Sequence, residues 1–188
     1  MQLSSLTPPM KPARGTDIPS GQDTTTPDFE TAFHTHWPRI HALLFRLTGD
    51  PDQAEDLALE VFLRLHREPR LLTPGQNLPA WLHRVAANLG YNALRAARRR
   101  QKYETEAGQL DLQTNPFPDP VREAERLAEQ AHVRRTLAHM KPRDAQLLLL
   151  RHSGLSYAEL AAALQLNPAS IGQLLSRAEK EFEKKYQA

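Results

Sequence analysis

Apolar positions recur at helical spacing along most of the chain, and the alternation expected of strands is nearly absent. The clearest pattern covers residues 50–68, where Asp50 is placed to cap a helix and Pro51 suits its first position. One stripe of this helix is apolar throughout and is predicted to face the core: Ala54, Leu57, Ala58, Val61, Phe62 and Leu65.

The opposite side of the same helix mixes leucine with carboxylates. It carries Asp56, Leu59, Glu60 and Leu63. An apolar patch that lies opposite a complete core stripe often marks a contact with another molecule. We therefore expect a partner protein to cover this side, with coverage by a neighbouring helix of the same domain as the alternative.

A second long helix is predicted over residues 79–103. Its expected buried stripe is Trp81, Leu82, Val85, Ala86, Leu89, Ala93 and Ala96. The far side carries, at intervals of three and four, Arg84, Asn88, Tyr91, Arg95, Arg98 and Lys102. These residues offer cations for phosphates, an amide for base edges and a ring for stacking. Residues 69–103 hold seven basic side chains and no acidic one, which favours nucleic acid over an ordinary solvated surface.

A helix-turn-helix is predicted near the C-terminus, with helices over residues 156–164 and 168–184. Ser156 and Glu159 have the spacing of a capping box. In the second helix the predicted inward side chains are Ile171, Leu174, Leu175, Ala178 and Phe182. The outward ones are Ala169, Ser170, Gln173, Ser176, Arg177 and Lys180. Small and polar outward residues suit the major groove of DNA, and a plain helical hairpin is the alternative.

Two proline-rich segments divide the chain. Residues 1–27 contain five of the fifteen prolines and are predicted to be disordered. Prolines at alternate positions in residues 116–120 exclude regular structure there. We therefore predict an all-α protein with two small helical domains joined by a flexible linker. The expected parts are a tail at 1–27, a first domain at 28–103, a linker at 104–121 and a helix-turn-helix domain at 122–188.

Composition narrows the function. The chain has no cysteine, which excludes a disulfide scaffold, a thiolate metal site and a cysteine nucleophile. Its eight histidines are scattered, so we predict no metal site, no cofactor and no catalytic residue, and an enzyme is disfavoured. No apolar run approaches the roughly 18 residues of a membrane span, and the N-terminus lacks the apolar core of a secretory signal. We expect a soluble cytoplasmic protein without membrane contact of its own.

Several segments together resemble a known family. Residues 54–65, AEDLALEVFLRL, are similar to region 2.2 of bacterial RNA polymerase sigma factors of the extracytoplasmic-function (ECF) type, within the sigma-70 family. Residues 81–89, WLHRVAANL, and 92–95, NALR, are similar to regions 2.3 and 2.4. Residues 147–152 and 154–161 are similar to region 4. The resemblance covers about 28–103 and 122–186.

The resemblance implies an alternative sigma factor, which binds core RNA polymerase and directs promoter recognition and DNA melting. It implies contacts with the clamp of the polymerase β′ subunit by Asp56, Leu59, Glu60 and Leu63, and a further contact of the second domain with the β flap. It implies contacts with the −10 element by Arg84, Asn88, Tyr91, Asn92, Arg95, Arg98, Arg99 and Lys102. It implies contacts with the −35 element by Ser170, Gln173, Ser176, Arg177 and Lys180. Most relatives are held inactive by an anti-sigma factor, which is therefore a candidate partner.

Five positions depart from the family's pattern. Leu59 stands where a polymerase-binding glutamine is usual, and Asn92 stands where an aspartate is usual. Gln165 replaces the glycine of the helix-turn-helix, so a non-glycine residue is expected to take a left-handed turn. Gly172 and Leu174 replace two cations of the recognition helix, so weaker or differently specific −35 binding is expected.

Two other functional interpretations stay open. A stand-alone helix-turn-helix transcription regulator would explain residues 132–188 but not the leucines and carboxylates at 56–63. A degenerate sigma-like interaction protein would bind polymerase without reading promoters, which agrees with the altered recognition helix. A separate hypothesis is that acidic linker residues mimic RNA near the polymerase active site; these are Glu104, Glu106, Asp111 and Asp119.

Overall fold

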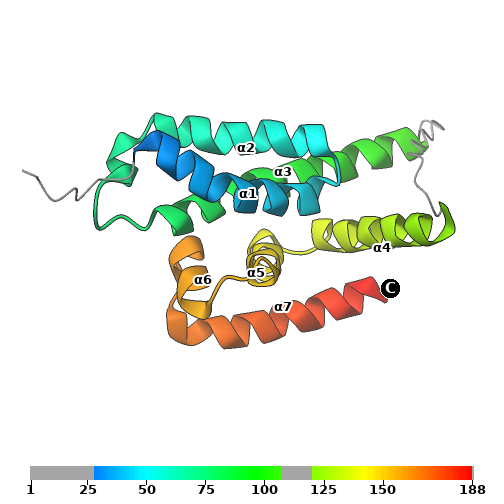
Figure 1. The fold of residues 1–188 in the computed structure, drawn as a ribbon. Coiled ribbons are helices and arrows are strands. Elements are labelled where there is room, and N and C mark those ends of the chain that lie inside the picture. Colours follow the sequence, from blue (N-terminus) through cyan, green and yellow to red (C-terminus); the bar gives the residue numbers. More distant parts are fainter. Residues whose placement is uncertain (1–27, 107–119, 188) are drawn as a thin grey trace, which may run out of the picture.

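The computed structural model describes residues 28–106 and 120–187, and all regular structure in these two ranges is helical, as predicted (Figure 1). The elements are α1 (Phe29–Thr48), α2 (Pro51–His66), η1 (Pro69–Leu72), α3 (Leu78–Glu106), α4 (Pro120–Ala138), α5 (Pro142–His152), α6 (Tyr157–Leu164), η2 (Pro168–Ser170) and α7 (Ile171–Tyr186). The predicted tail and most of the predicted linker, with Asp111 and Asp119, lie outside the described residues. So do the side chains of Glu104 and Glu106.

The first helical unit consists of α1, α2 and α3, which pack on one another. Asp50 caps α2 as predicted, since its carboxylate accepts hydrogen bonds from the backbone N–H groups of Asp52 at 3.0 Å and Gln53 at 3.2 Å. The predicted core stripe of α2 is confirmed, with five of its six side chains buried and Leu57 partly buried. These side chains pack against α1, where the ring centroid of Phe33 lies 4.8 Å from that of Phe62.

Helices α1 and α3 approach each other closely at Gly90. A Cβ atom at this position would collide with the side chain of Leu47 and lie 3.1 Å from Leu44 Cδ2. Both leucines are fully buried, so the space beside Gly90 is already filled. The absence of a side chain at Gly90 therefore lets the two helices pack at short range.

The second unit consists of α4 to α7 and contains the predicted helix-turn-helix. Ser156 and Glu159 form the predicted capping box of α6, with the Ser156 N–H donating to Glu159 Oε2 at 2.7 Å. Gln165 has φ 55°, so a non-glycine residue does take the left-handed turn. The second helix of the motif differs slightly from the prediction, because residues 168–170 form the short η2 before α7 begins at Ile171.

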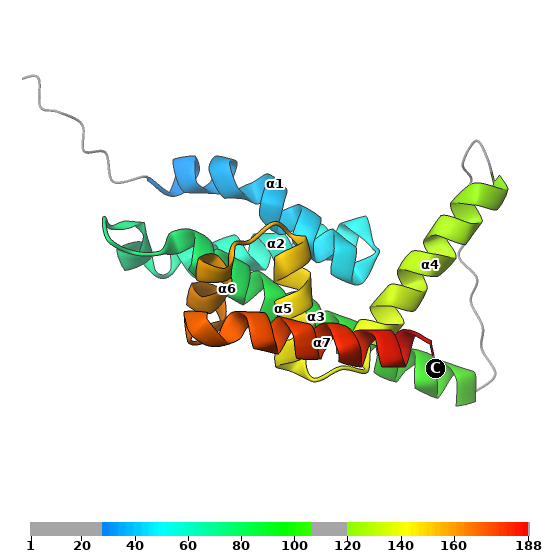
Figure 2. The same ribbon diagram turned by 90° about the horizontal axis from the view of Figure 1, so that it is seen from below.

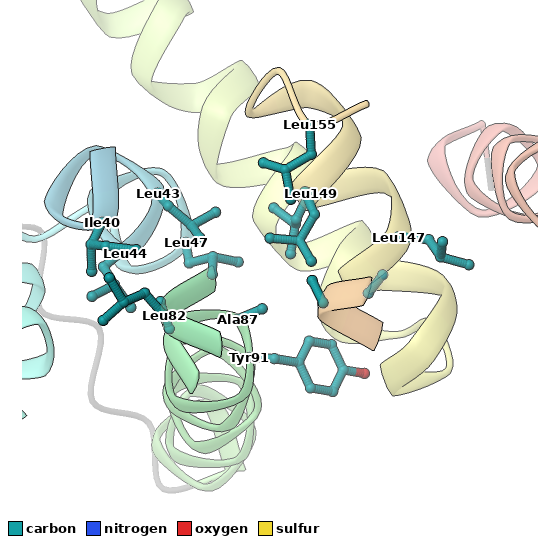
Figure 3. Packing of buried hydrophobic residues seen from close by; sticks show 14 of the residues in the cluster. Ile40, Leu43, Leu44, Leu47, Leu82, Ala87, Tyr91, Leu147, Leu149 and Leu155 are labelled. Atoms are coloured by element: carbon teal, nitrogen blue, oxygen red, sulfur yellow. The ribbon is translucent and has the colours of Figure 1, made fainter. Parts of the chain in front are cut away.

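The two units pack against each other along α3. Helices α4, α5 and α6 all contact α3, and α5 and α6 lie between α3 and α7 (Figures 1 and 2). In close-up, Leu149 and Leu155 of the second unit face Leu43 and Leu47 of α1, and the Tyr91 ring lies between α3 and α5 (Figure 3). The buried apolar residues of both units thus form one continuous cluster.

This packing corrects the predicted core face of α3. The expected stripe is partly right, since Leu82 and Ala86 are buried, but a second side of α3 is buried as well. It carries His83, Ala87, Tyr91 and Leu94. The physical reason is that α1 and α2 cover one side of α3 while α4, α5 and α6 cover another. None of the helices within 28–106 and 120–187 is both long enough and apolar enough to cross a membrane.

Candidate functional site

The leucine–carboxylate face of α2, formed by Asp56, Leu59, Glu60 and Leu63, points away from the core. Leu59 is 48% exposed and Leu63 is 44% exposed, while the opposite stripe of the same helix is buried. No element within the described residues covers these leucines, so the alternative of an intradomain neighbour is not supported. The Glu60 carboxylate accepts a hydrogen bond from Arg64 Nε at 2.8 Å, one turn further along. The face therefore presents two exposed apolar side chains beside negative charge, which suits contact with another protein.

The predicted basic ridge of α3 is the set Arg84, Asn88, Tyr91, Asn92, Arg95, Arg98, Arg99 and Lys102. Asn92, Arg95 and Arg99 are exposed, and Arg84 is half-buried. The side chain of Lys102 lies outside the described residues. The exposed arginines give this part of α3 the positive surface that the sequence indicates.

Three members of the ridge contact the second unit; of these Tyr91 is buried, whereas Asn88 and Arg98 stay exposed. Tyr91 is only 2% exposed, and its hydroxyl donates to the Met140 carbonyl at 2.6 Å. Arg98 Nη1 donates to the Ala138 carbonyl at 3.2 Å. The Asn88 Oδ1 atom accepts from Gln146 Nε2 at 2.7 Å. These contacts join α3 to the end of α4 and to α5.

The expectation that Tyr91 is an exposed stacking ring is wrong for this structure. Burial raises the pKa of Tyr91 above its ordinary value, although the nearby Arg95 and Arg98 act in the opposite direction. Its hydroxyl therefore keeps its proton at neutral pH and can donate to Met140. The sequence does contain a signal for this burial, because Ala87, Tyr91 and Leu94 are spaced by four and three residues.

Sequence reasoning also missed a group of titratable side chains between the two units. His83 on α3 is buried, and its Nδ1–H donates to the Pro79 carbonyl at 2.7 Å. Burial lowers the pKa of His83, and burial also lowers the pKa of His36, with the positive charge of Arg39 acting in the same direction. Glu159 of α6 lies near enough to oppose the shift at His83. Both histidines are therefore neutral at pH 7.

Most of the residues of η2 and α7 that were predicted to face outward are exposed. Gln173, Ser176, Arg177 and Lys180 are exposed, and Ser170 is half-buried. The Ser170 hydroxyl donates to the Asn167 carbonyl at 2.8 Å, so it already has a partner within the turn.

The two positions that depart from the family's recognition helix are both half-buried. Leu174 packs against the core, and Gly172 faces the ring of Tyr157. A side chain at Gly172 would make only ordinary contact with that ring at 3.7 Å, so packing does not demand glycine here. The ring of Tyr157 also lies 5.5 Å from the Arg151 guanidinium carbon, a cation–π pair that the sequence pattern did not reveal.

The described side chains offer no arrangement of three or more His, Asp or Glu residues that would hold a metal ion. What they offer is two kinds of surface: the leucine–carboxylate face of α2, and basic or polar faces on α3 and α7. Such surfaces bind protein and polyanion respectively.

Models of known protein families match both helical units. Residues 32–100 match Sigma-70 region 2, and residues 131–182 match Sigma-70 region 4. The chain belongs to the sigma-70 family. Its surfaces map onto these matches, with the α2 face and the α3 ridge inside region 2 and the helix-turn-helix inside region 4.

Relatives of ECF type share sequence along most of the chain. It is 30% identical to the ECF RNA polymerase sigma factor SigE of Mycolicibacterium smegmatis over 168 residues, which cover 87% of this chain and 63% of that protein. It is 29% identical to EcfG of Rhodopseudomonas palustris, with 77% of each chain covered, and 29% identical to CarQ of Myxococcus xanthus, with 83% and 86% covered. The chain spans only 63% of SigE and 48% of SigG of Mycobacterium tuberculosis. Members of this family are transcription initiation factors rather than enzymes.

A solved structure supports the fold. The sigma factor RpoE of Bartonella quintana, determined in complex with the anti-sigma factor NepR, superposes with a TM-score of 0.54 at 21% identity. The alignment covers 86% of this chain and 98% of that one. The likeness therefore extends over both helical units.

Proposed function

We propose that this protein is an alternative sigma factor, which binds core RNA polymerase and directs promoter recognition and DNA melting. The observation that carries the proposal is the leucine–carboxylate face of α2. Leu59 and Leu63 are about half exposed opposite a buried stripe, within the segment that matches region 2. A DNA-binding regulator acting alone has no need of such a face, whereas a subunit of a larger enzyme does.

In this proposal each surface has its own partner. The leucine–carboxylate face docks on the clamp of the β′ subunit through Asp56, Leu59, Glu60 and Leu63, and the second unit contacts the β flap. The basic ridge of α3 holds the −10 element, with arginines on phosphates and Asn88 and Asn92 on bases. The outward face of α7 lies in the major groove of the −35 element, where Gln173 and Arg177 are suited to base edges.

The protein contributes specificity and no catalysis. Polymerase supplies the chemistry, so no cofactor is needed and the protein acts in the cytoplasm, where polymerase and chromosome are. An anti-sigma factor is a further candidate partner, because the RpoE of similar fold is bound to one.

A second candidate function is an interaction protein that binds polymerase without reading a −35 element. The observation that favours it is the recognition helix, where Gly172 and the half-buried Leu174 occupy positions that carry cations in the family. Each phosphate contact that is missing reduces the slope of the logarithm of the DNA-binding constant against the logarithm of salt concentration by about one.

The test is transcription by purified bacterial core polymerase on a library of genomic fragments, with and without the protein. The decisive variant is Leu59→Asp/Leu63→Asp. We expect it to weaken polymerase binding by at least about tenfold, since each leucine contributes roughly 1 kcal/mol or more when its exposed part is buried. The matched control is Leu127→Asp on α4, because Leu127 is 40% exposed and lies outside the proposed surfaces.

Each outcome identifies one function. Discrete transcripts that require the protein, vanish with the double variant and persist with the control support a sigma factor. Polymerase binding that is sensitive to the double variant, without transcripts, identifies the interaction protein. Neither transcripts nor polymerase binding would exclude both and leave the stand-alone regulator.

A further inference from the structure

A buried histidine lies where helices of both units meet. His83, in the second turn of α3, is only 7% exposed. Helices α1 and α6 both pack on α3 (Figures 1 and 2), and a charged residue from each acts on His83: Arg39 from α1 and Glu159 from α6. His83 belongs to none of the surfaces proposed above for polymerase or DNA, so its burial here calls for a separate explanation.

The hydrogen bond of His83 fixes where its proton lies. A carbonyl oxygen can only accept, so the Nδ1 atom, 2.7 Å from the Pro79 carbonyl, carries the proton of the neutral ring. The Nε2 atom then has a bare lone pair, and no described residue forms a hydrogen bond with it. Protonation of the ring adds an N–H group at Nε2, inside the packed helices and without an acceptor from them. Burying such a donor together with a positive charge is unfavourable.

The charged groups around His83 come from the two helices that pack on it. Arg39 of α1 is a permanent cation, and His36 on the same helix becomes a second one when it is protonated. Glu159 of α6 acts in the opposite direction, but its Oε2 atom already accepts from the N–H and the hydroxyl of Ser156, both at 2.7 Å. Within the described residues, α2, α4 and α5 contribute no charge that acts on the ring.

The packed arrangement therefore holds the pKa of His83 below its ordinary value of 6.5, chiefly through burial. A ring that is exposed when α6 leaves regains the ordinary value, so the released form takes up a proton first as the pH falls. Packing is fully favoured above about pH 6.5 and is weakened below it. The pKa of Glu159 is lowered from 4.5, mainly by its bonds to Ser156, so this carboxylate stays charged over the same range.

We propose that the junction of α1, α3 and α6 is a proton-sensitive contact, in which protonation of His83 releases α6 from the first helical unit. The inference does not depend on the function proposed above, because it concerns how helices pack and not what they bind. For each unit by which packing lowers the pKa of His83, acid raises the ratio of released to packed protein by up to about tenfold.

The test measures the separation of α2 and α6 by fluorescence energy transfer in the full chain. The chain has no cysteine, so Glu55→Cys and Ala162→Cys provide two thiols for a donor and an acceptor dye. Glu55 lies on α2 and Ala162 on α6; both are exposed, and neither belongs to a proposed binding surface. Energy transfer is recorded from about pH 7.5 to about pH 5.5, where histidine titrates. Circular dichroism over the same range reports whether the helices stay formed.

The matched variants of the labelled protein are His83→Gln and His139→Gln. His139 forms the same local bond as His83, from Nδ1 to the carbonyl four positions earlier at 2.7 Å, but it is exposed. On acidification we expect the ratio of released to packed protein to rise about fivefold or more in the parent and in His139→Gln. His83→Gln should stay packed. A parent protein without this acid response, or an equal response in His83→Gln, would overturn the proposal.

Two charge variants test the same contact should His83→Gln fail to pack at neutral pH. Arg39→Gln removes a cation that opposes protonation of His83, so packing lowers the pKa less and the acid response should shrink. Glu159→Gln removes the anion that favours protonation, so the acid response should grow, and glutamine still suits the capping box. Equal acid responses in these two variants would contradict the role of His83.

Discussion

The hydrogen bond between Tyr91 and Met140 allows the packing of the two units to be tested by removing a single oxygen atom. Tyr91→Phe removes the hydroxyl that donates to the Met140 carbonyl at 2.6 Å and keeps the ring that fills the space between α3 and α5. No cavity is created, so the change isolates the hydrogen bond. The Met140 carbonyl is left buried without this donor.

The expected loss is about 1–3 kcal/mol in the free energy of unfolding, because a buried acceptor that loses its donor retains its desolvation penalty. The wild-type protein should also lose stability as the pH rises above about 10, the ordinary pKa of tyrosine. Burial raises the pKa of Tyr91, so the folded state holds this proton more tightly than the unfolded state does. Tyr91→Phe removes that part of the pH dependence.

The assay is urea denaturation of the full chain followed by circular dichroism. Tyr103→Phe is the matched control, since Tyr103 is 69% exposed and its hydroxyl should contribute within about 0.5 kcal/mol. If Tyr91→Phe and Tyr103→Phe were equally stable, the buried contact between α3 and Met140 would not exist in solution.

Two further predictions concern the α1–α3 contact and the buried histidines. Gly90→Ala should destabilise the protein in the same denaturation assay. The added methyl group overpacks the core beside Leu44 and Leu47, which costs about 1–3 kcal/mol, and this cost exceeds the gain of about 1 kcal/mol in helix propensity. A stabilised variant would show that α1 and α3 can move apart freely. His83→Gln should flatten the loss of stability on acidification: burial lowers the pKa of His83, so the unfolded state takes up the proton first and stability falls as the pH drops below about 6.5. The arginine beside it, Arg39, opposes protonation as well, whereas Glu159 favours it, and a variant with an unchanged pH profile would contradict this assignment.

The helices with strong local signals were predicted well from the sequence. Asp50 and Pro51 define the start of α2, and its complete apolar stripe defines its buried side. Ser156 and Glu159 define the start of α6 in the same way. Each of these signals involves residues within a few positions of one another, so the surrounding fold is not needed to interpret them.

The position of Tyr91 could not be obtained by the same reasoning. Tyr91 is spaced at helical intervals from Asn88 and Arg95, and this pattern predicted that its ring lies on a surface for nucleic acid. Whether its side is buried depends on a contact with Met140, 49 positions away. A helix can bury two of its sides when elements pack against both of them. Whether one side or two sides are buried depends on how segments distant in sequence pack.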